Sequence, residues 1–177
     1  MKILNLYFTA TGNTTKVAEK IEATLREGGH NVETRKVTAN LNVDILAYDY
    51  VFLGSGVYEW LPGQPVINFV KNLRRRYADD GEIKPSSPKL PGKKAVIYCT
   101  YGGAHTGVNE AIPATKYMAQ IFEHLGFEIA AEWHFIGEYH GRFEPMSTGG
   151  RLGDIRGRPN EADLQEVAEK VRGIVQG

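Results

Sequence analysis

The sequence predicts a single α/β domain in which helices cover both faces of a parallel β-sheet. Its 177 residues suit one domain with a full hydrophobic core. Three short apolar runs, at residues 3–8, 50–53 and 95–99, show the near-continuous hydrophobicity of strands that are buried on both faces. Amphipathic stretches separate these runs, and such alternation of strand and helix is typical of a doubly wound sheet.

Four stretches of the chain show the periodicity of amphipathic helices. The first ends at Gly28 and Gly29, the second is entered through Pro62, and the third is closed by Gly126. The fourth begins at Asn160, which is a good N-cap residue. The inward-facing residues recur every three or four positions: Val17, Ile21 and Leu25; Val66, Phe69, Val70, Leu73 and Tyr77; Ala111, Thr115, Met118, Phe122 and Leu125; Leu164, Val167, Ala168, Val171 and Val175.

Two further strands have the pattern of sheet edges. Residues 31–37 are mostly polar, and residues 127–135 alternate, with Phe127, Ile129, Ala131, Trp133 and Phe135 expected on one side. If these second and fifth strands are the edges, the order is 2-1-3-4-5. The predicted fold is therefore a doubly wound five-stranded parallel sheet with helices on both faces and a ligand crevice between strands 1 and 3.

Two segments interrupt this rhythm without suggesting a domain boundary. Residues 78–92 are rich in proline, glycine and acidic residues, and indicate a surface excursion. Residues 139–159 form a longer excursion that contains several glycines and arginines. A loop of that length is either disordered or functional. We therefore expect one domain, residues 1–177, with excursions at about 78–92 and 139–159.

Composition excludes several classes of protein. Twenty-one basic residues balance twenty-one acidic ones, which gives no field to attract nucleic acid or an anionic membrane. Cys99 is the only cysteine, so neither an internal disulfide framework nor a cysteine-based metal cluster is expected, and the histidine spacing predicts no metal site. Neither a secretory signal peptide nor a membrane-spanning apolar run is visible. The expected location is the cytoplasm.

The strongest local signal follows the first strand. A turn here, at the start of a helix, offers backbone N–H groups at the positive end of the helix dipole, and these suit a phosphate. Gly12 allows close approach of the backbone, and several hydroxyls surround it. The candidate phosphate-binding residues are Thr9, Ala10, Thr11, Gly12, Asn13 and Thr14.

The turn does not match the phosphate loops of other nucleotide-binding proteins. The dinucleotide fingerprint G-x-G-x-x-G and the triphosphate loop G-x-x-x-x-G-K-[ST] are both absent here. The threonines could merely cap the helix, as threonine and asparagine often do. The four hydroxyls of Thr9, Thr11, Thr14 and Thr15 around one glycine are nevertheless more than a helix cap requires.

The segment Thr9–Thr14 resembles the T/S-x-T-G-N-T loop with which flavodoxins bind the phosphate of FMN. The resemblance covers about residues 1–138 in the order of elements, together with the final helix. It implies a flavodoxin-like fold, an FMN cofactor, and single-electron exchange with protein partners. Many family members have proline after Gly-Ser in the loop that follows the third strand, whereas this chain has Gly56.

The same resemblance implies that two loops bind the flavin ring. The loop after the third strand contributes Ser55, Gly56, Val57, Tyr58 and Trp60, and the loop after the fourth contributes Thr100, Tyr101, Gly102 and Gly103. Aromatic residues beside glycines suit a flat ring whose polar edge is met by backbone groups. Tyr101 would stack on one ring face, and Trp60 or Tyr58 would cover the other. Each of these aromatic residues could instead simply close the end of the core.

The function predicted first is that of an FMN-binding electron carrier, and two alternatives stand beside it. An electron carrier would exchange electrons with protein partners. An enzyme would pass electrons from NAD(P)H to a quinone or similar acceptor, with His105 as a candidate proton donor. The excursion at 139–159, with apolar Phe143, Met146, Leu152 and Ile155, favours a lid or subunit arm over the flavin, which also allows a homo-oligomer. A flavin-free interaction module remains only if the threonine loop is a cap.

Overall fold

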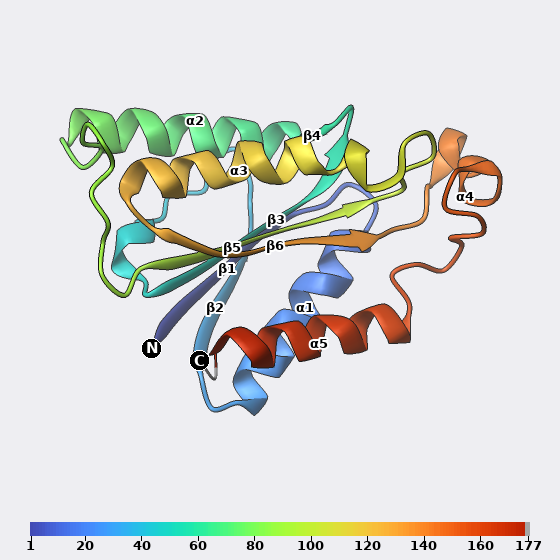
Figure 1. The fold of residues 1–177 in the computed structure, drawn as a ribbon, viewed down its shortest axis with the longest axis horizontal. Coiled ribbons are helices and arrows are strands. Elements are labelled where there is room, and N and C mark those ends of the chain that lie inside the picture. The colour runs from blue at the N-terminus through green and yellow to red at the C-terminus, as the bar shows by residue number, and fades with distance from the viewer. Residues whose placement is uncertain (176–177) are drawn as a thin grey trace.

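One twisted sheet organises the molecule. In the computed structural model, which describes residues 1–175, its parallel strands lie in the order β2-β1-β3-β5-β6 (Figure 1). Counted along the five main strands, this is the order 2-1-3-4-5, so the predicted topology is confirmed. The strands are β1 (Lys2–Phe8), β2 (Asn31–Lys36), β3 (Tyr50–Tyr58), β5 (Lys94–Tyr101) and β6 (Glu128–Ile136). A short β4 (Leu61–Pro62), which the sequence did not predict, pairs antiparallel with the end of β3.

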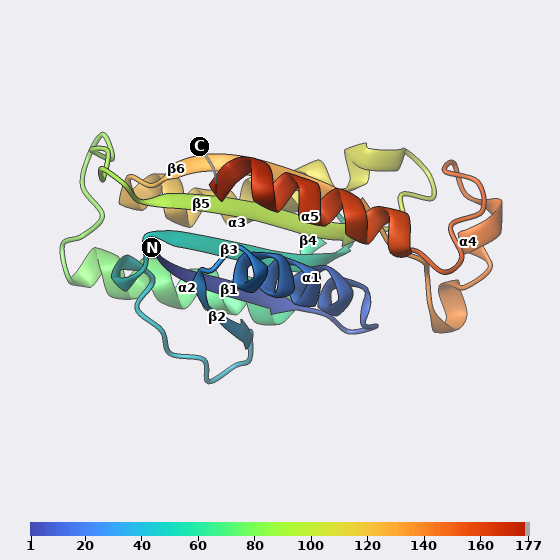
Figure 2. The same ribbon diagram turned by 90° about the horizontal axis from the view of Figure 1, so that it is seen from below.

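Helices cover both faces of the sheet, as predicted. Figure 1 shows α2 (Gln64–Asp79) and α3 (Ile112–Leu125) on one face and α1 (Asn13–Glu27) and α5 (Glu161–Val175) on the other. In Figure 2, which views the molecule from below, α1 and α5 lie beside each other in front of the sheet. Short helical turns complete the chain: η1 (Ile45–Ala47), η2 (Gly107–Glu110), η3 (Gly141–Phe143) and α4 (Met146–Gly149). No helix within residues 1–175 is long and apolar enough to cross a membrane.

The sheet separates the hydrophobic core into two halves because successive residues of a strand point to opposite faces. Leu4 and Leu6 of β1 face the half that α2 and α3 cover, whereas Ile3 faces the half beneath α1 and α5. The central strand β3 is buried from Tyr50 to Gly56. This is the burial that its continuous apolar run predicted.

The expected side-chain alternation along the last strand is wrong. Phe127 packs in the half under α2 and α3, but Trp133 and Phe135 pack in the other half. The cause is a bulge, because Ala95 pairs with Ile129 and the next residue, Val96, pairs with Ala131. The extra residue shifts the side-chain alternation by one position, so that one strand supplies aromatic residues to both halves of the core.

A buried polar contact crosses the middle of the sheet. The Tyr98 hydroxyl of β5 donates to Asn5 Oδ1 of β1 at 3.0 Å, and both side chains are fully buried. Asn5 Nδ2 in turn donates to the Ala18 carbonyl of α1 at 3.0 Å. The intervening strand must leave room for the tyrosine ring, and it does so at Gly54. A Cβ at Gly54 would lie 2.1 Å from that ring.

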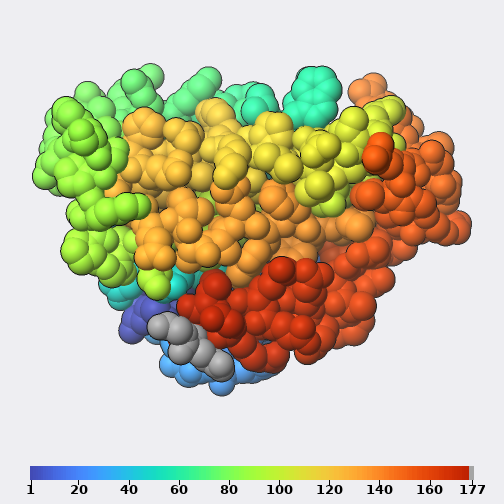
Figure 3. All heavy atoms as spheres, in the orientation of Figure 1, coloured from blue at the N-terminus to red at the C-terminus, as the bar shows by residue number. Residues whose placement is uncertain are grey.

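The loops that follow the parallel strands all begin at the same end of the sheet, where the carboxyl ends of the strands lie. The register pairs Phe8 with Ser55, Ser55 with Cys99, and Gly56 with Thr100. The three loops that follow β1, β3 and β5 therefore begin in neighbouring rows. The segment that contains η3 and α4 protrudes at this same end of the molecule, where it forms the orange-red lobe of Figure 3.

We expect Gly54→Ala to destabilise the fold, because the Tyr98 ring is fully buried and its hydroxyl is held by Asn5. Overpacking of this kind costs about 1–3 kcal/mol, which urea denaturation monitored by circular dichroism would measure. The matched control is Gly173→Ala in α5, where an added Cβ meets nothing within 4 Å and should stabilise the helix slightly. Equal stability of the two variants would contradict this account.

Candidate functional site

A pocket of about 670 Å³ opens at the carboxyl edge of the sheet. Its walls come from the start of α1, the β3–β4 hairpin, the loop after β5, and residues 137–146. The pocket lies at the switch point between β1 and β3, which is the expected place for a ligand in an open α/β sheet. The residues expected from the sequence that line it are Thr11, Asn13, Gly56, Val57, Tyr58, Trp60, Thr100, Tyr101, Gly102, Gly103 and His105.

The remaining expected residues do not line the pocket. Thr9, Thr14 and Ser55 are buried. Ala10 is exposed and Gly12 is partly exposed, both within the turn that precedes α1. These residues belong to the turn and the hairpin, whereas their neighbours Thr11, Asn13 and Gly56 line the cavity.

The backbone amides of the turn before α1 are only partly used within the protein. Gly12 adopts a left-handed conformation with φ of 97°, and its amide donates to Thr9 Oγ1 at 2.9 Å. No side chain caps α1, so the capping interpretation of the threonines is not supported. Within residues 1–175, the amides of Thr11, Asn13 and Thr14 donate to no protein acceptor.

This donor set fits a phosphate group. Three free amides lie at the positive end of a fifteen-residue helix, and the nearby hydroxyls of Thr9 and Thr11 can add further donors. Thr9 Oγ1 only accepts in the bond from Gly12, so its own hydrogen stays available. The space beside Gly12 is open to a ligand, since a Cβ built there would contact nothing within 4 Å.

A buried hydroxyl pair joins the first turn of α1 to the end of β5. Thr14 Oγ1 and Thr100 Oγ1 are 2.8 Å apart, and the two residues are 0% and 4% exposed. Either oxygen can be the donor. Because both hydroxyls are shielded from water, breaking this pair would leave a buried polar group unsatisfied. The two walls of the pocket are therefore held at a fixed separation.

The β3–β4 hairpin is built on an unusual turn. Tyr58 pairs with Leu61, so Glu59 and Trp60 form a two-residue connection, and both have positive φ, 48° and 68°. Such turns normally use asparagine or glycine, and a bulky residue in this conformation is strained. The hairpin base is fixed by Ser55, whose hydroxyl donates to the Gly56 carbonyl and accepts from the Gly63 amide.

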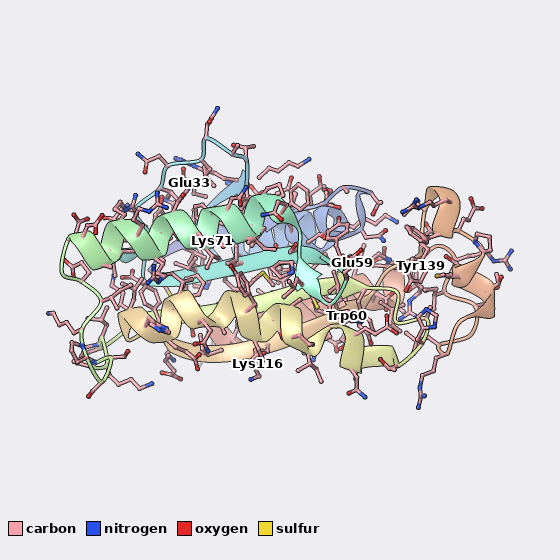
Figure 4. The ribbon with its side chains drawn as sticks, turned by 90° about the horizontal axis from the view of Figure 1, so that it is seen from above. Glu33, Glu59, Trp60, Lys71, Lys116 and Tyr139 are labelled. Carbon is pink, nitrogen blue, oxygen red and sulfur yellow. The ribbon has the colours of Figure 1, made fainter. Side chains whose placement is uncertain are left out.

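Two tyrosines that line the pocket make the same kind of contact: each hydroxyl accepts a hydrogen bond from a backbone amide, and each ring covers a glycine. The Ala10 amide donates to the Tyr58 hydroxyl at 3.0 Å, and the Ala104 amide donates to the Tyr139 hydroxyl at 3.2 Å. Each ring covers a glycine: a Cβ at Gly56 would lie 2.9 Å from the Tyr58 hydroxyl, and one at Gly102 would lie 2.2 Å from the Tyr139 ring. Figure 4 shows Tyr139 and Trp60 at the same end of the molecule.

The loop after β5 is held rigidly before it reaches α3. Gly103 has a φ of +57°, and the Glu110 carboxylate accepts from the amides of His105 and Thr106 at 2.7 and 2.6 Å. The His105 side chain is exposed and borders the pocket. Tyr101 is 9% exposed, and its burial raises the pKa of its hydroxyl, so it stays neutral at physiological pH.

The segment after β6 supplies pocket residues that were not among the expected cofactor-binding residues, although Phe143 and Met146 were expected to belong to a lid or arm over the flavin. They are Glu138, Tyr139, His140, Arg142, Phe143 and Met146, and Leu61 of the hairpin and Glu110 join them. The sequence showed only a long loop with apolar anchors. Of those anchors, Ile155 is 2% exposed, so the end of the segment farther from β6 is packed into the protein. Phe143 beside the pocket is 44% exposed.

Asn13 connects the turn before α1 to this segment. Its Nδ2 donates to the Glu138 carbonyl at 2.8 Å, and its Oδ1 lies 3.4 Å from His140 Nε2. Gly137 makes the approach possible, because a Cβ there would lie 2.7 Å from Asn13 Nδ2. Residues 137–140 are therefore joined to the turn through Asn13 and to the loop after β5 through Tyr139.

Other candidate chemistry finds no geometric support. No group of three or more histidine, cysteine, aspartate or glutamate side chains within residues 1–175 could hold a metal ion. Cys99 is fully buried in β5, and desolvation raises the pKa of its thiol far above the usual range. His134 is paired with Thr115 at 3.1 Å, and burial lowers the pKa of its imidazole.

Comparisons with known proteins agree with this architecture. A protein-family model described as a flavodoxin domain matches residues 4–137. Among solved structures, oxidised flavodoxin 2 from Bacillus cereus is 18% identical with a TM-score of 0.67, and the alignment covers 99% of each chain. No curated protein sequence gave a significant match.

Two further structures share the fold. A WrbA-like flavodoxin protein from Agrobacterium tumefaciens is 12% identical with a TM-score of 0.64, over 99% of this chain and 95% of that one. A point mutant of Fusobacterium nucleatum flavodoxin, bound to flavin mononucleotide, is 15% identical with a TM-score of 0.62, again over 99% and 95%. Fold and family model together place the chain in one class of doubly wound redox proteins. The chain belongs to the flavodoxin family, whose members are flavin-binding redox proteins.

We expect Tyr139→Ala to release residues 139–147 from the loop after β5, because it removes both the ring over Gly102 and the acceptor of the Ala104 amide. Trypsin should then cleave after the exposed Arg142 several-fold faster than in the unmodified protein. Cleavage after the exposed Arg74 of α2 serves as the internal control and should not change. Equal acceleration at both arginines would indicate general unfolding and contradict the local account.

Proposed function

We propose that this protein binds one FMN in the pocket at the carboxyl edge and exchanges electrons with protein partners. One observation carries the proposal: a turn with free amides, suited to a phosphate, opens into the same pocket as two aromatic, glycine-containing loops. FMN supplies the redox chemistry when bound, while the protein supplies binding and electrostatics. The Fusobacterium nucleatum flavodoxin with FMN bound shares this fold, which agrees with the proposal.

Each wall of the pocket would have a separate task. The amides of Thr11, Asn13 and Thr14, together with the hydroxyls of Thr9 and Thr11, would hold the phosphate. Tyr101 would stack on one face of the ring and Tyr58 on the other, because both border the pocket beside glycines. Backbone groups of Thr100, Gly102 and Gly103 would bond the polar edge of the ring.

The mouth of the pocket supports docking of a protein partner. Four of the eight large apolar side chains that are exposed within residues 1–175 border it: Tyr58, Trp60, Leu61 and Phe143. Trp60 is the most exposed of these, at 62%, on the strained turn of the hairpin. Exposed aromatic residues beside a redox site form the kind of patch that partner proteins bury.

A second candidate function is NAD(P)H-dependent reduction of a quinone-like acceptor. His105, His140 and Arg142 all border the pocket. These side chains are suited to supply a proton or a positive charge to a small acceptor. The shared fold of a WrbA-like protein agrees with either role.

Spectroscopy of the purified protein tests both candidates. After incubation with FMN and gel filtration, we expect visible flavin absorbance in a one-to-one ratio with protein. An electron carrier should be reduced by dithionite, reduce cytochrome c as a model acceptor, and react slowly with NAD(P)H. Rapid NAD(P)H oxidation that depends on a quinone would instead assign the enzyme. Protein without flavin absorbance after this treatment would contradict FMN binding itself.

We expect Trp60→Ala to slow electron transfer to a protein acceptor several-fold while the Kd for FMN changes less than about twofold. The reason is that Trp60 projects from the rim, whereas Tyr58 lies across the pocket. Stopped-flow reduction of cytochrome c and fluorescence titration with FMN measure the two quantities. Leu90→Ala, an exposed apolar residue in the connection between α2 and β5, is the control and should leave both unchanged. A loss of FMN affinity in Trp60→Ala would contradict the assignment.

A further inference from the structure

Tyr58 occupies a position that joins the two parts of the proposed FMN site. It is the last residue of β3, yet its hydroxyl lies 3.0 Å from the Ala10 amide in the turn before α1. Its ring is 6.2 Å from the Phe8 ring and covers both Gly56 and Gly63. These contacts hold the side chain across the pocket edge, where only 37% of its surface remains exposed.

The hydrogen bond to Ala10 uses only one of the two capacities of the hydroxyl. In that bond the oxygen accepts, so the hydroxyl hydrogen is still available to an acceptor. Within residues 1–175, no protein acceptor receives it. Burial raises the pKa of Tyr58, which keeps this hydrogen in place at neutral pH.

The free amides near the Tyr58 hydroxyl and the hydroxyl itself are all suited to donate to a phosphate. The free amides of Thr11 and Asn13 belong to the same turn as Ala10, and Thr11, Asn13 and Tyr58 border the same pocket. A phosphate monoester offers several acceptor oxygens and a double negative charge, and hydrogen bonds to charged oxygens are the stronger ones. The bond from Ala10 orients the phenol oxygen at the edge of this donor set.

We infer that Tyr58 recognises both halves of FMN: its ring covers the flavin, and its hydroxyl donates a hydrogen bond to the phosphate. This inference rests on the proposed function and adds a donor from β3 to a phosphate site otherwise built from the turn before α1. Tyr58 thereby ties the position of the phosphate to that of the ring, and it selects the phosphorylated flavin over riboflavin.

Tyr58→Phe tests this inference, because the variant keeps the ring and loses only the hydroxyl. Apoprotein is titrated with FMN and with riboflavin, which has the same ring but no phosphate, and flavin fluorescence reports binding. We expect the Kd for FMN to rise about tenfold, the effect of losing one hydrogen bond to a charged group, while the Kd for riboflavin stays unchanged. Inorganic phosphate should also compete with FMN less strongly in the variant than in the unmodified protein.

Tyr139→Phe is the matched control, since it removes the equivalent phenol–amide bond at the loop after β5. It should change the affinities for FMN and riboflavin by the same factor.

If Tyr58→Phe also weakens the binding of both flavins equally, the hydroxyl is only structural and the inference is overturned. Tighter binding of FMN or phosphate by Tyr58→Phe overturns it too, because the hydroxyl would then compete for the Ala10 amide. If the unmodified protein binds neither flavin, the proposed function itself fails.

Discussion

The alignment of β1, β3 and β5 is the constraint on which the rest of the structure depends. Phe8, Ser55 and Cys99 lie in one row of the sheet, so the chain leaves all three strands at the same level. The turn before α1, the β3–β4 hairpin and the loop after β5 therefore meet without any long connection. A shift of one residue in either pairing would separate the Thr14 and Thr100 hydroxyls and turn every side chain of a strand to the other face.

Aromatic rings laid over glycines recur throughout the molecule. Tyr98 covers Gly54 in the core, Tyr58 covers Gly56 at the pocket, and Tyr139 covers Gly102 on the opposite wall. In each case the ring takes the volume that a side chain would occupy, and the hydroxyl then bonds a group on a neighbouring element. The same device serves stability in the core and defines the shape of the pocket at the edge.

The sequence predicted the parts of the fold that depend on local patterns. The continuous apolar runs of β1, β3 and β5 indicated buried parallel strands. The threonine-rich turn at residues 9–14 indicated an anion site, which stays a prediction. The bulge in β6 was missed because a strict alternation of apolar residues gives no sign that one residue is unpaired. The β4 strand was missed because it has only two residues and contains Pro62.

The pocket wall after β6 could not be predicted for a different reason: Tyr139 and His140 lie far from Ala104 and Asn13 along the chain, and they meet only through the tertiary structure. A glycine that admits a distant ring, such as Gly102, gives no local pattern that identifies its partner.

The strained hairpin turn at Glu59 and Trp60 has a consequence for the evolution and engineering of this protein. Both residues have backbone conformations that asparagine and glycine adopt at lower cost, so an Asn-Gly turn would favour a more stable fold. Selection for stability alone would therefore remove the most exposed aromatic side chain beside the pocket. Under the proposed function, Trp60 on such a turn represents a trade-off between partner docking and stability, and thermostabilised versions of this protein should leave the hairpin unchanged.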